Sequence, residues 1–368
     1  MSRTSVAPDG LSSSQTILLA LLVGFSLGTV GLLALALMVW LSHQRFGVDR
    51  SGKHGISVRN TSRLGGLAIV LFLATVCLIS LLNQEIGLGL TLVVPMASLP
   101  FYIWPVLLIG VIGLADDVGI AIKPSIRLST ILSVGLVFFF LRPELLPNRL
   151  LEVLSIENDW GIGLLTVAST VLLAGFVNAA NISDGANGLL SGLCLVFFWV
   201  SWELQGDSWS FYLLVILLCF WLINVLTGRI MLGDLGAYAL GALVVLVGFN
   251  LFDEQGVSSF FLASLLCYPC VELVRVMVVR RLRGQSPLSA DDTHLHNLLN
   301  SKLRVSLQGN TLPNSLTGVI VVLFTSLPGI AIFNLNLQAN TMVTLAAFSL
   351  QAIVFLFLWA WLKKADDS

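Results

Sequence analysis

Short polar segments rich in carboxylates, amides and glycines interrupt the long apolar runs of this sequence. The ionisable residues in these segments that could do chemistry are Asp116, Asp117, Asp184, Asp234, His294 and His296. A carboxylate at a membrane edge is costly and marks a candidate functional site. Carboxylate and amide oxygens are ligands of hard cations such as Mg²⁺, which often combines one or two carboxylates with substrate phosphates. The segments therefore predict a divalent-metal site for a phosphate-containing substrate.

Glycines beside two of the carboxylates support this interpretation. The segments DGANG (184–188) and GDLG (233–236) let the backbone approach a ligand closely. Asn181, Asp184 and Asn187 are spaced three residues apart, so a helix would present them on one side. Basic loops nearby would add positive charge for phosphate oxygens. Together these features indicate a diphosphate-containing substrate that is handled at a membrane surface.

Each segment on its own also fits a structural role. Asp116 and Asp117 could form a solvated turn at a helix end, and histidines in loops are often only solvated. Glu272 fits a structural ion pair with Arg275, less than one helical turn later. The functional interpretation depends on all the segments facing one side of the membrane, as the expected topology requires.

The rest of the chain has the composition of a polytopic membrane protein. Of its 368 residues, 57% are hydrophobic and 11% are charged, whereas soluble proteins carry roughly 25% charged residues. Continuous apolar runs of roughly 20 residues predict membrane-spanning helices rather than barrel strands. We expect an all-α fold in which Pro269 kinks the ninth span. The eleven expected spans are 16–41, 65–83, 99–115, 127–141, 162–180, 188–204, 211–227, 236–252, 258–279, 314–334 and 342–362.

Lys and Arg residues set the expected orientation, because cytoplasmic loops carry an excess of them. Of the 19 Lys and Arg residues, all but Arg3, Arg142 and Arg149 lie in or beside one set of alternating segments. The segments predicted to be cytoplasmic are 42–64, 116–126, 181–187, 228–235, 280–313 and the C-terminal tail 363–368. The N-terminus then lies outside, with a disordered tail expected at 1–15 and a single membrane domain at 16–362. Every candidate carboxylate faces the cytoplasm in this topology.

Five short sequence motifs are spread over most of the chain. They are SRLGGLAI (62–69), GLADDVG (113–119), NAANISDGANGL (178–189), GDLGAYALG (233–241) and SPLSADDTHLHNLL (286–299). Together they resemble the polyprenyl-phosphate N-acetylhexosamine-1-phosphate transferases of glycosyltransferase family 4. That family includes phospho-MurNAc-pentapeptide translocase and the GlcNAc-1-phosphate transferases that initiate O-antigen and teichoic acid synthesis. Eleven spans with a cytoplasmic C-terminus match the GlcNAc-transferring branch better than the translocase.

The resemblance implies a reaction, a cofactor and a location. A UDP-N-acetyl-sugar would donate its sugar 1-phosphate to polyprenyl (undecaprenyl) phosphate, giving a polyprenyl-diphospho-sugar and UMP, at the start of cell-envelope polysaccharide synthesis. The reaction would need Mg²⁺, with Mn²⁺ as a substitute, in a cytoplasmic cleft of a multi-pass protein of the bacterial inner membrane. The implied partners are both substrates and the lipid bilayer, without nucleic acid, and a homodimer is left open.

The resemblance also assigns roles to individual residues. Asp234 and Asn181 would hold the metal ion, and Asp116, Asp117 and Asp184 would be catalytic. The expected substrate-binding residues are Lys53, Asn178, Asn187, Met231, Gly233, His294 and His296.

Three positions depart from the family's pattern. Asn187 replaces the second Asp of D-G-x-D, and Asn297 stands where a third His is usual. Met231 replaces an aromatic residue that is expected against uracil. The missing third His argues against MurNAc-pentapeptide as the donor group. GlcNAc is the default sugar, and a modified relative such as QuiNAc or FucNAc stays open.

Two other classes of protein compete with the transferase. A transporter or lipid flippase would place its acids near mid-membrane, and only Glu272 fits that position. A lipid-diphosphate hydrolase would use water in place of the lipid acceptor. For a transferase, direct attack by the lipid phosphate and a two-step route through an aspartyl-phosphate both fit the sequence. We favour direct attack, because an ionised phosphate needs positioning and charge neutralisation more than a strong base.

Overall fold

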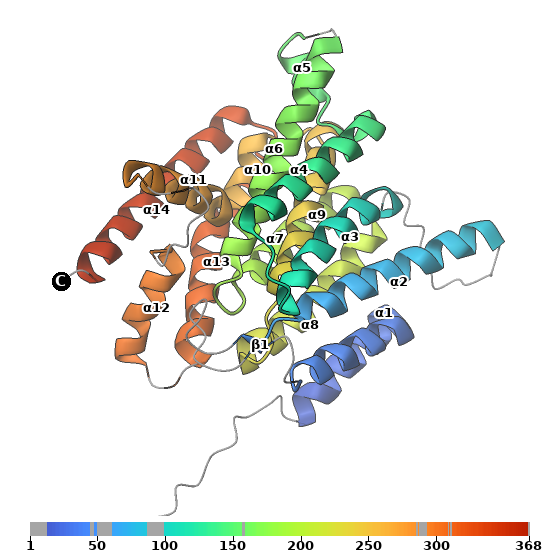
Figure 1. The fold of residues 1–368 in the computed structure, drawn as a ribbon, viewed down its shortest axis with the longest axis vertical. Helices are drawn as coiled ribbons and strands as arrows, with labels where there is room; N and C mark the ends of the chain where they lie inside the picture. Colours follow the sequence, from blue (N-terminus) through green and yellow to red (C-terminus); the bar gives the residue numbers. More distant parts are fainter. Residues whose placement is uncertain are drawn as a thin grey trace, which may run out of the picture.

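The computed structural model describes residues 13–44, 48–49, 61–86, 99–156, 159–284, 286, 293–307, 309 and 311–366. Within these residues, the fold consists of helices, short irregular connections and two short strands. The strands β1 (Val48–Asp49) and β2 (Thr61–Ser62) pair antiparallel. The helices are α1 (Ser13–Leu41), α2 (Gly65–Ile86), α3 (Leu99–Asp117), α4 (Pro124–Leu141), α5 (Arg149–Val153), α6 (Asp159–Ser183), α7 (Leu189–Gln205), α8 (Ser208–Thr227), α9 (Gly233–Glu254), α10 (Ser259–Leu265), α11 (Cys267–Leu282), α12 (Leu295–Ser306), α13 (Thr311–Asn334) and α14 (Thr341–Asp366), with a 3₁₀ turn at Pro143–Leu145. Figure 1 shows their arrangement.

Each predicted span coincides with a helix or, at 258–279, with a pair of helices. Among the described residues, seven helices are long and apolar enough to cross a membrane, or eight if the bent pair counts as one span. Leu27–Leu41 and Leu189–Gln205 are shorter apolar helices. The all-α, multi-pass membrane architecture is therefore confirmed, whereas the number of eleven spans and their orientation stay predictions.

The two ends of the chain differ slightly from the expected boundaries. α1 begins at Ser13, inside the tail predicted at 1–15, and the residues before Ser13 lie outside the described part of the chain. α14 continues to Asp366, so most of the predicted tail 363–368 extends the last helix.

The ninth predicted span is broken rather than gently kinked. α10 and α11 meet at Leu266 with an angle of 90° between them. Pro269 lies in the first turn of α11 and has no amide hydrogen to donate to the carbonyl of Leu265. The hydroxyl of Ser326 in α13 donates to that carbonyl instead, at 3.1 Å. The proline that was expected to bend this span thus lies beside the break, and α13 supplies the hydrogen bond that the backbone loses there.

Helix α9 (22 residues) lies inside the bundle, beside α3 (Figure 1), and 18 of its residues are buried. Small residues let its neighbours approach closely. A Cβ on Gly66 of α2 would lie 2.2 Å from the Cα of Gly236, so the two backbones touch at a point that admits no side chain. This packing fixes the start of α2 against the first turn of α9.

The opposite end of α9 is hydrogen-bonded to the segment that begins α5. The carboxylate of Asp253 accepts the amides of Asn148 at 2.9 Å and of Arg149 at 3.2 Å. Nη1 of Arg149 donates to the carbonyl of Phe252 at 2.8 Å. Both ends of the central helix are therefore held by contacts with other elements.

Helices α4 and α14 are the most exposed of the apolar helices. Only 22% of Pro124–Leu141 and 17% of an 18-residue stretch within Thr341–Ala365 are buried. Their exposed side chains include Phe140, Phe357 and Trp361. In a membrane protein such apolar faces meet lipid tails, which are as apolar as the side chains themselves.

Helix α12 lies in the segment 280–313, for which the sequence analysis expects only a loop. It packs against α13 and α14. Its buried residues are Leu295, His296, Leu298 and Asn300, whereas Lys302 and Arg304 are exposed. A short amphipathic helix has too little apolar surface to appear in a search for membrane spans, so the sequence pattern left it undetected.

Candidate active site

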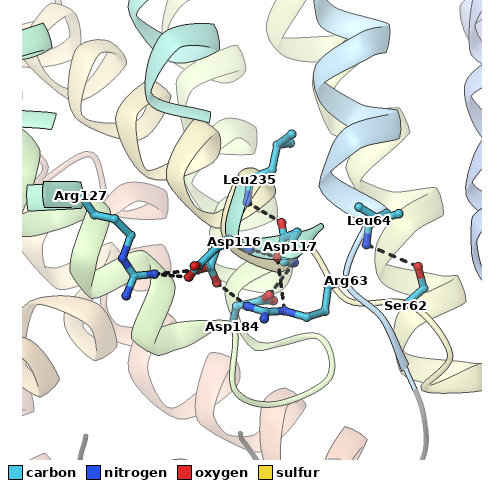
Figure 2. A network of polar contacts seen from close by, with 10 residues as sticks. Ser62, Arg63, Leu64, Asp116, Asp117, Arg127, Asp184 and Leu235 are labelled. Atoms are coloured by element: carbon cyan, nitrogen blue, oxygen red, sulfur yellow. Dashed lines mark hydrogen bonds and ion pairs between the residues drawn. The ribbon is translucent and has the colours of Figure 1, made fainter. Parts of the chain in front are cut away.

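Three helix ends meet at one place and bring the predicted carboxylates together (Figure 2). α3 ends with Asp116 and Asp117, Asp184 directly follows α6, and Asp234 is the second residue of α9. Asp117 and Asp184 both accept hydrogen bonds from backbone amides at the start of α9. Carboxylates that are far apart in the sequence therefore share one site.

The segment before α2 lies alongside the segment before α9. The amide of Ser62 donates to the carbonyl of Arg229 at 2.9 Å, and the amide of Met231 donates to the carbonyl of Ser62 at 2.8 Å. The amide of Gly65 donates to the carbonyl of Met231 at 2.9 Å. This pairing sets Arg63, which lies between Ser62 and Gly65, beside the first residues of α9.

Asp117 caps the start of α9. Its carboxylate is fully buried, with 0% of the side chain exposed. Oδ1 accepts the amide of Asp234 at 3.0 Å, Oδ2 accepts the amide of Leu235 at 2.9 Å, and Nε of Arg63 lies 3.3 Å from Oδ1. Burial and the charge of Asp234 raise the pKa of Asp117 to about 7, against the lowering effect of Arg63 and the two amides. Two amides of the first helical turn are thereby satisfied.

Asp184 holds the residue that precedes Asp234. Its Oδ2 accepts the amide of Gly233 at 2.9 Å. Removal from water raises the pKa of Asp184 well above its ordinary value, although the Gly233 amide and Arg63 lower it. Gly233 has a φ of 73°, and a Cβ there would lie 1.9 Å from the carbonyl oxygen of Arg63, so this turn requires glycine. Three successive amides at the start of α9 thus donate to carboxylates, which fixes the position of Asp234.

Two arginines link the remaining carboxylates, as Figure 2 shows for Arg127 and Asp116. Nη2 of Arg63 donates to Oδ1 of Asp234 at 2.6 Å, and Nη1 of Arg127 donates to Oδ2 of Asp234 at 3.1 Å. Nη1 of Arg127 also donates to Asp116, whose side chain is 21% exposed. The four carboxylates and the two guanidinium groups form one network, and Asp116 is more exposed in it than Asp117 or Asp234.

The carboxylate oxygens of this network suit a hard cation. In the described part of the chain, no group of three or more His, Cys, Asp and Glu side chains is arranged to hold a metal ion by itself. An ion would therefore need oxygens from a substrate or from water, which is how Mg²⁺ is commonly held. Asp234 is the best candidate ligand, because its oxygens contact arginine side chains that can rotate away. Asp117, in contrast, is bonded to two backbone amides, which cannot rotate away from it.

The start of α12, with His294 as its N-cap residue and His296 in its first turn, packs against the segment that carries Asp184. His296 is buried, and its Nδ1 is hydrogen-bonded to the hydroxyl of Tyr268. A Cβ on Gly185 would lie 2.2 Å from Nε2 of His296, so the ring edge touches the backbone next to Asp184. Burial lowers the pKa of His296 well below its ordinary value, so the ring is neutral at pH 7.

His294 contacts a carboxylate of α11. Its Nδ1 lies 2.7 Å from Oε1 of Glu272. Glu272 also forms the predicted ion pair with Arg275, through Nε at 3.2 Å and through Nη2. The ion pair expected from the spacing is confirmed, but the spacing does not predict the contact between Glu272 and His294.

Asn187 is buried against the start of α13. Its backbone amide donates to Oδ1 of Asn314 at 2.8 Å, and its Nδ2 donates to the hydroxyl of Ser315 at 3.2 Å. These contacts hold the segment that follows Asp184. They give Asn187 a structural role in this structure, and its role in substrate binding stays a prediction.

The other predicted residues lie around the network with fewer contacts. Asn178 is partly exposed and donates its side-chain amide to a carbonyl of its own helix at 2.7 Å. The carbonyl of Asn181 accepts the amide of Asp184 at 3.2 Å, and Met231 is partly exposed. Lys53 lies outside the described residues. Their predicted roles in binding metal or substrate stay predictions.

Sequence reasoning missed three residues of the site. Arg63 lies inside the first motif, but its charge was not connected with a carboxylate. Arg127 was used only as an indicator of orientation, and Glu272 only as an ion-pair partner. The sequence did offer a signal, because each of these charged residues lies in or beside an apolar run. A charged side chain in such a place usually pairs with another charged or polar group.

The chain is similar to members of one family of enzymes. Residues 102–251 match the profile of glycosyl transferase family 4. The chain is 27% identical over 335 residues to the phospho-N-acetylmuramoyl-pentapeptide-transferase of Levilactobacillus brevis, a match that covers 84% of this chain and 99% of that protein. It is 26% identical over 220 residues to the undecaprenyl-phosphate alpha-N-acetylglucosaminyl 1-phosphate transferase of Thermotoga maritima, covering 59% and 67%.

A further match covers a smaller share of the chain. The undecaprenyl-phosphate alpha-N-acetylglucosaminyl 1-phosphate transferase of Escherichia coli is 29% identical over 138 residues, which are 33% of this chain and 37% of that protein. This match therefore covers just over a third of the length of that relative. Together with the family profile, the matches confirm the resemblance that the five motifs carried.

Proposed function

We propose that this chain, which belongs to glycosyl transferase family 4, transfers a sugar 1-phosphate from a UDP-N-acetylhexosamine to polyprenyl phosphate. The observation that carries the proposal is the network of Asp116, Asp117, Asp184 and Asp234 with two arginines, assembled from three helix ends. Such a network provides oxygens for a divalent cation and positive charge for phosphate. Both are needed to transfer a phosphate-bearing group.

The residues of the network divide the work according to their contacts. Asp117 and Asp184 hold the start of α9 and so position Asp234. Asp116, whose side chain is 21% exposed, is the candidate to accept a residual proton of the acceptor phosphate. Arg63 and Arg127 would neutralise phosphate oxygens of the substrates, since a guanidinium matches phosphate geometry.

Asp234, with the side chain of Asn181, would hold Mg²⁺, for which Mn²⁺ could substitute. When bound, the ion would neutralise charge on the diphosphate and on the UMP leaving group. The protein side chains would align an acceptor phosphate oxygen with the phosphorus that carries the sugar. A new phosphorus–oxygen bond forms as the bond to the UMP oxygen breaks, and the products are polyprenyl-diphospho-sugar and UMP.

We favour direct attack by the lipid phosphate over a two-step route. The carboxylate of Asp117 is buried and accepts two amides, which makes it a poor nucleophile. Asp116 is more exposed, and incubation with radiolabelled UDP-sugar in the absence of lipid tests whether it becomes phosphorylated. A labelled Asp116 peptide that is discharged by polyprenyl phosphate would establish the two-step route instead.

The donor would lie between the network and the start of α12. His296 packs next to the Asp184–Gly185 backbone and His294 stacks on His296, which supports a role of these histidines at the donor diphosphate or sugar. The proposed residues around the donor are Lys53, Asn178, Asn187, Met231, Gly233, His294 and His296. GlcNAc is the proposed sugar. The proposed location is the bacterial cytoplasmic membrane, which the protein would cross several times. The reaction would start the synthesis of a cell-envelope polysaccharide such as O-antigen.

The test is release of UMP by purified protein from a panel of UDP-N-acetyl-sugars. We expect release to require both undecaprenyl phosphate and Mg²⁺. Asp234→Asn should abolish it, whereas Glu254→Gln, at the exposed far end of the same helix, should not change it. Release that does not need the lipid would identify a hydrolase. No release from any donor, with the protein folded, would reject the proposed reaction.

A further inference from the structure

The accessible histidine of the site is His294, not His296. The side chain of His294 is 13% exposed, whereas His296 is 2% exposed. Nδ1 of His296 is bound to Tyr268, and its Nε2 abuts Gly185. The two rings lie nearly parallel, with centroids 5.4 Å apart and 3° between their planes. His296 therefore serves as the packing surface on which the ring of His294 rests.

The tautomer of His294 is set by a buried carboxylate. Oε1 of Glu272 lies 2.7 Å from Nδ1 of His294, and the Glu272 side chain is 0% exposed. An ionised carboxylate can only accept a hydrogen bond, so Nδ1 carries the hydrogen. Nε2 is then the nitrogen left to meet a ligand, as an acceptor in the neutral ring or as a donor in the charged ring.

Other side chains hold Glu272 and the backbone next to His294. Arg275 binds both oxygens of Glu272, and its guanidinium lies 4.7 Å from the ring centroid of Trp359 in α14. Nε1 of Trp359 donates to the carbonyl of Thr293 at 2.8 Å. The residue before His294 and the carboxylate on its Nδ1 are thus both fixed, by α14 and α11 respectively.

We propose that Glu272 is a positioning residue for the transfer reaction, which holds His294 with Nδ1 protonated and leaves Nε2 for the donor substrate. This inference rests on the proposed function and concerns the same site. The contacts run from the Asp184–Gly185 backbone to His296, then to His294 and to Glu272. Among the described residues, the hydrogen-bonded partners of Glu272 are His294 and Arg275 and neither belongs to the carboxylate network, so we expect its effect on transfer to pass through His294.

The kinetic test replaces Glu272 and Arg275 together by Met, because substitution of a whole buried ion pair by apolar residues is often tolerated. We expect kcat/KM for UDP-sugar to fall on the order of 10- to 100-fold, the range found for partners that orient histidines in metal sites. In a His294→Ala background the same two substitutions should change kcat/KM less than about threefold, because the partner they act through is gone. The proposal would be overturned if kcat/KM falls by the same factor in the wild-type and His294→Ala backgrounds, or if it does not fall in the wild-type background.

Arg275→Met alone keeps the carboxylate on His294 and removes the ion pair; because loss of one partner of a buried pair is itself destabilising, its activity is read together with its melting temperature. It should retain much more activity than the double variant. If Arg275→Met alone reproduces the full loss while its melting temperature stays that of the wild type, the ion pair and not the histidine contact explains the effect. That result would reject the positioning role.

A measurement without substrate separates this inference from the proposed reaction. The chain has only four histidines, so ¹⁵N-histidine labelling gives few ring signals, and His294→Gln assigns one of them. We expect the His294 ring to carry its proton on Nδ1 in the wild type and to lose this preference in the Met double variant. A wild-type ring with unprotonated Nδ1 would reject the inference. If the protein releases no UMP, the reaction fails, but the ring nitrogen shifts still decide the role of Glu272.

Discussion

Replacing Asp117 by Asn tests whether this residue caps α9. Asp117 accepts two amides, one with each oxygen, and its side chain is 0% exposed. Asn has a single acceptor oxygen, so the NH₂ group would face the amide of Asp234 or that of Leu235. One buried amide would lose its partner, and Arg63 would lose one of its two carboxylate contacts.

The magnitude follows from the burial of the amide. An unsatisfied buried amide costs about 1–3 kcal/mol, so we expect Asp117→Asn to lower the free energy of unfolding by about 2 kcal/mol. With the unfolding entropy of an average globular residue, a chain of this length would melt about 3 °C lower. Asp116→Asn is the matched comparison, because the Asp116 side chain is 21% exposed and accepts only one backbone amide, that of Ile122 at 3.4 Å in a part-buried position, so its loss should cost less stability.

The assay is thermal unfolding of the purified variants in one detergent, followed by the fraction that stays monodisperse after heating. Both variants should lose UMP release, but only Asp117→Asn should melt clearly below the wild type. If Asp117→Asn melts with the wild type, or if Asp116→Asn is the less stable of the two, the capping role of Asp117 is refuted.

Three further outcomes follow from the site and can be measured on the same preparations. Asp234→Ala should abolish UMP release and any stabilisation of the protein by added Mg²⁺, and turnover near the wild-type level would exclude Asp234 from the site. Gly233→Ala should lower the melting temperature or prevent folding, because its Cβ would lie 1.9 Å from a carbonyl oxygen at a φ of 73°, whereas Gly163→Ala, with open space around it, should not. Because the pKa of His296 is lowered in the folded state, the unfolded chain binds the extra proton, so stability should fall as the pH drops below about 6.5. His296→Gln should show a weaker fall in melting temperature between pH 7 and pH 5, and an unchanged fall would contradict the assignment.

The sequence predicted the spans well because their signal is local. Long apolar runs predict α2, α6 and α13 within a few residues, since every backbone group in lipid must be satisfied within a helix. The break between α10 and α11 was harder to predict. Pro269 pointed to a bend, but a 90° turn requires Ser326 of another helix to take the carbonyl of Leu265, and no local pattern reveals such a partner.

The candidate site was predicted by residue type better than by role. Hydropathy and charge placed Asp117, Asp184 and Asp234 on one face, and the structure joins them through the amides of residues 233–235. That two of these carboxylates bind backbone amides could not be predicted, because it depends on how α3 and α6 pack against α9. The same limit applies to Glu272. Its spacing from Arg275 predicts the ion pair, but no local pattern predicts its contact with His294, which lies 22 residues later in the sequence.

Helix α9 is hydrogen-bonded to other elements at both of its ends, through Gly233–Leu235 at one end and through Asp253 at the other. Bilayers differ in hydrocarbon thickness, and helices commonly adapt to a mismatch by tilting. A tilt of α9 would break contacts at both ends, whereas α4 and α14 are mostly exposed and have fewer contacts to lose. The outer helices can therefore adjust to the thickness of the surrounding lipid, while the spacing between the carboxylates stays the same.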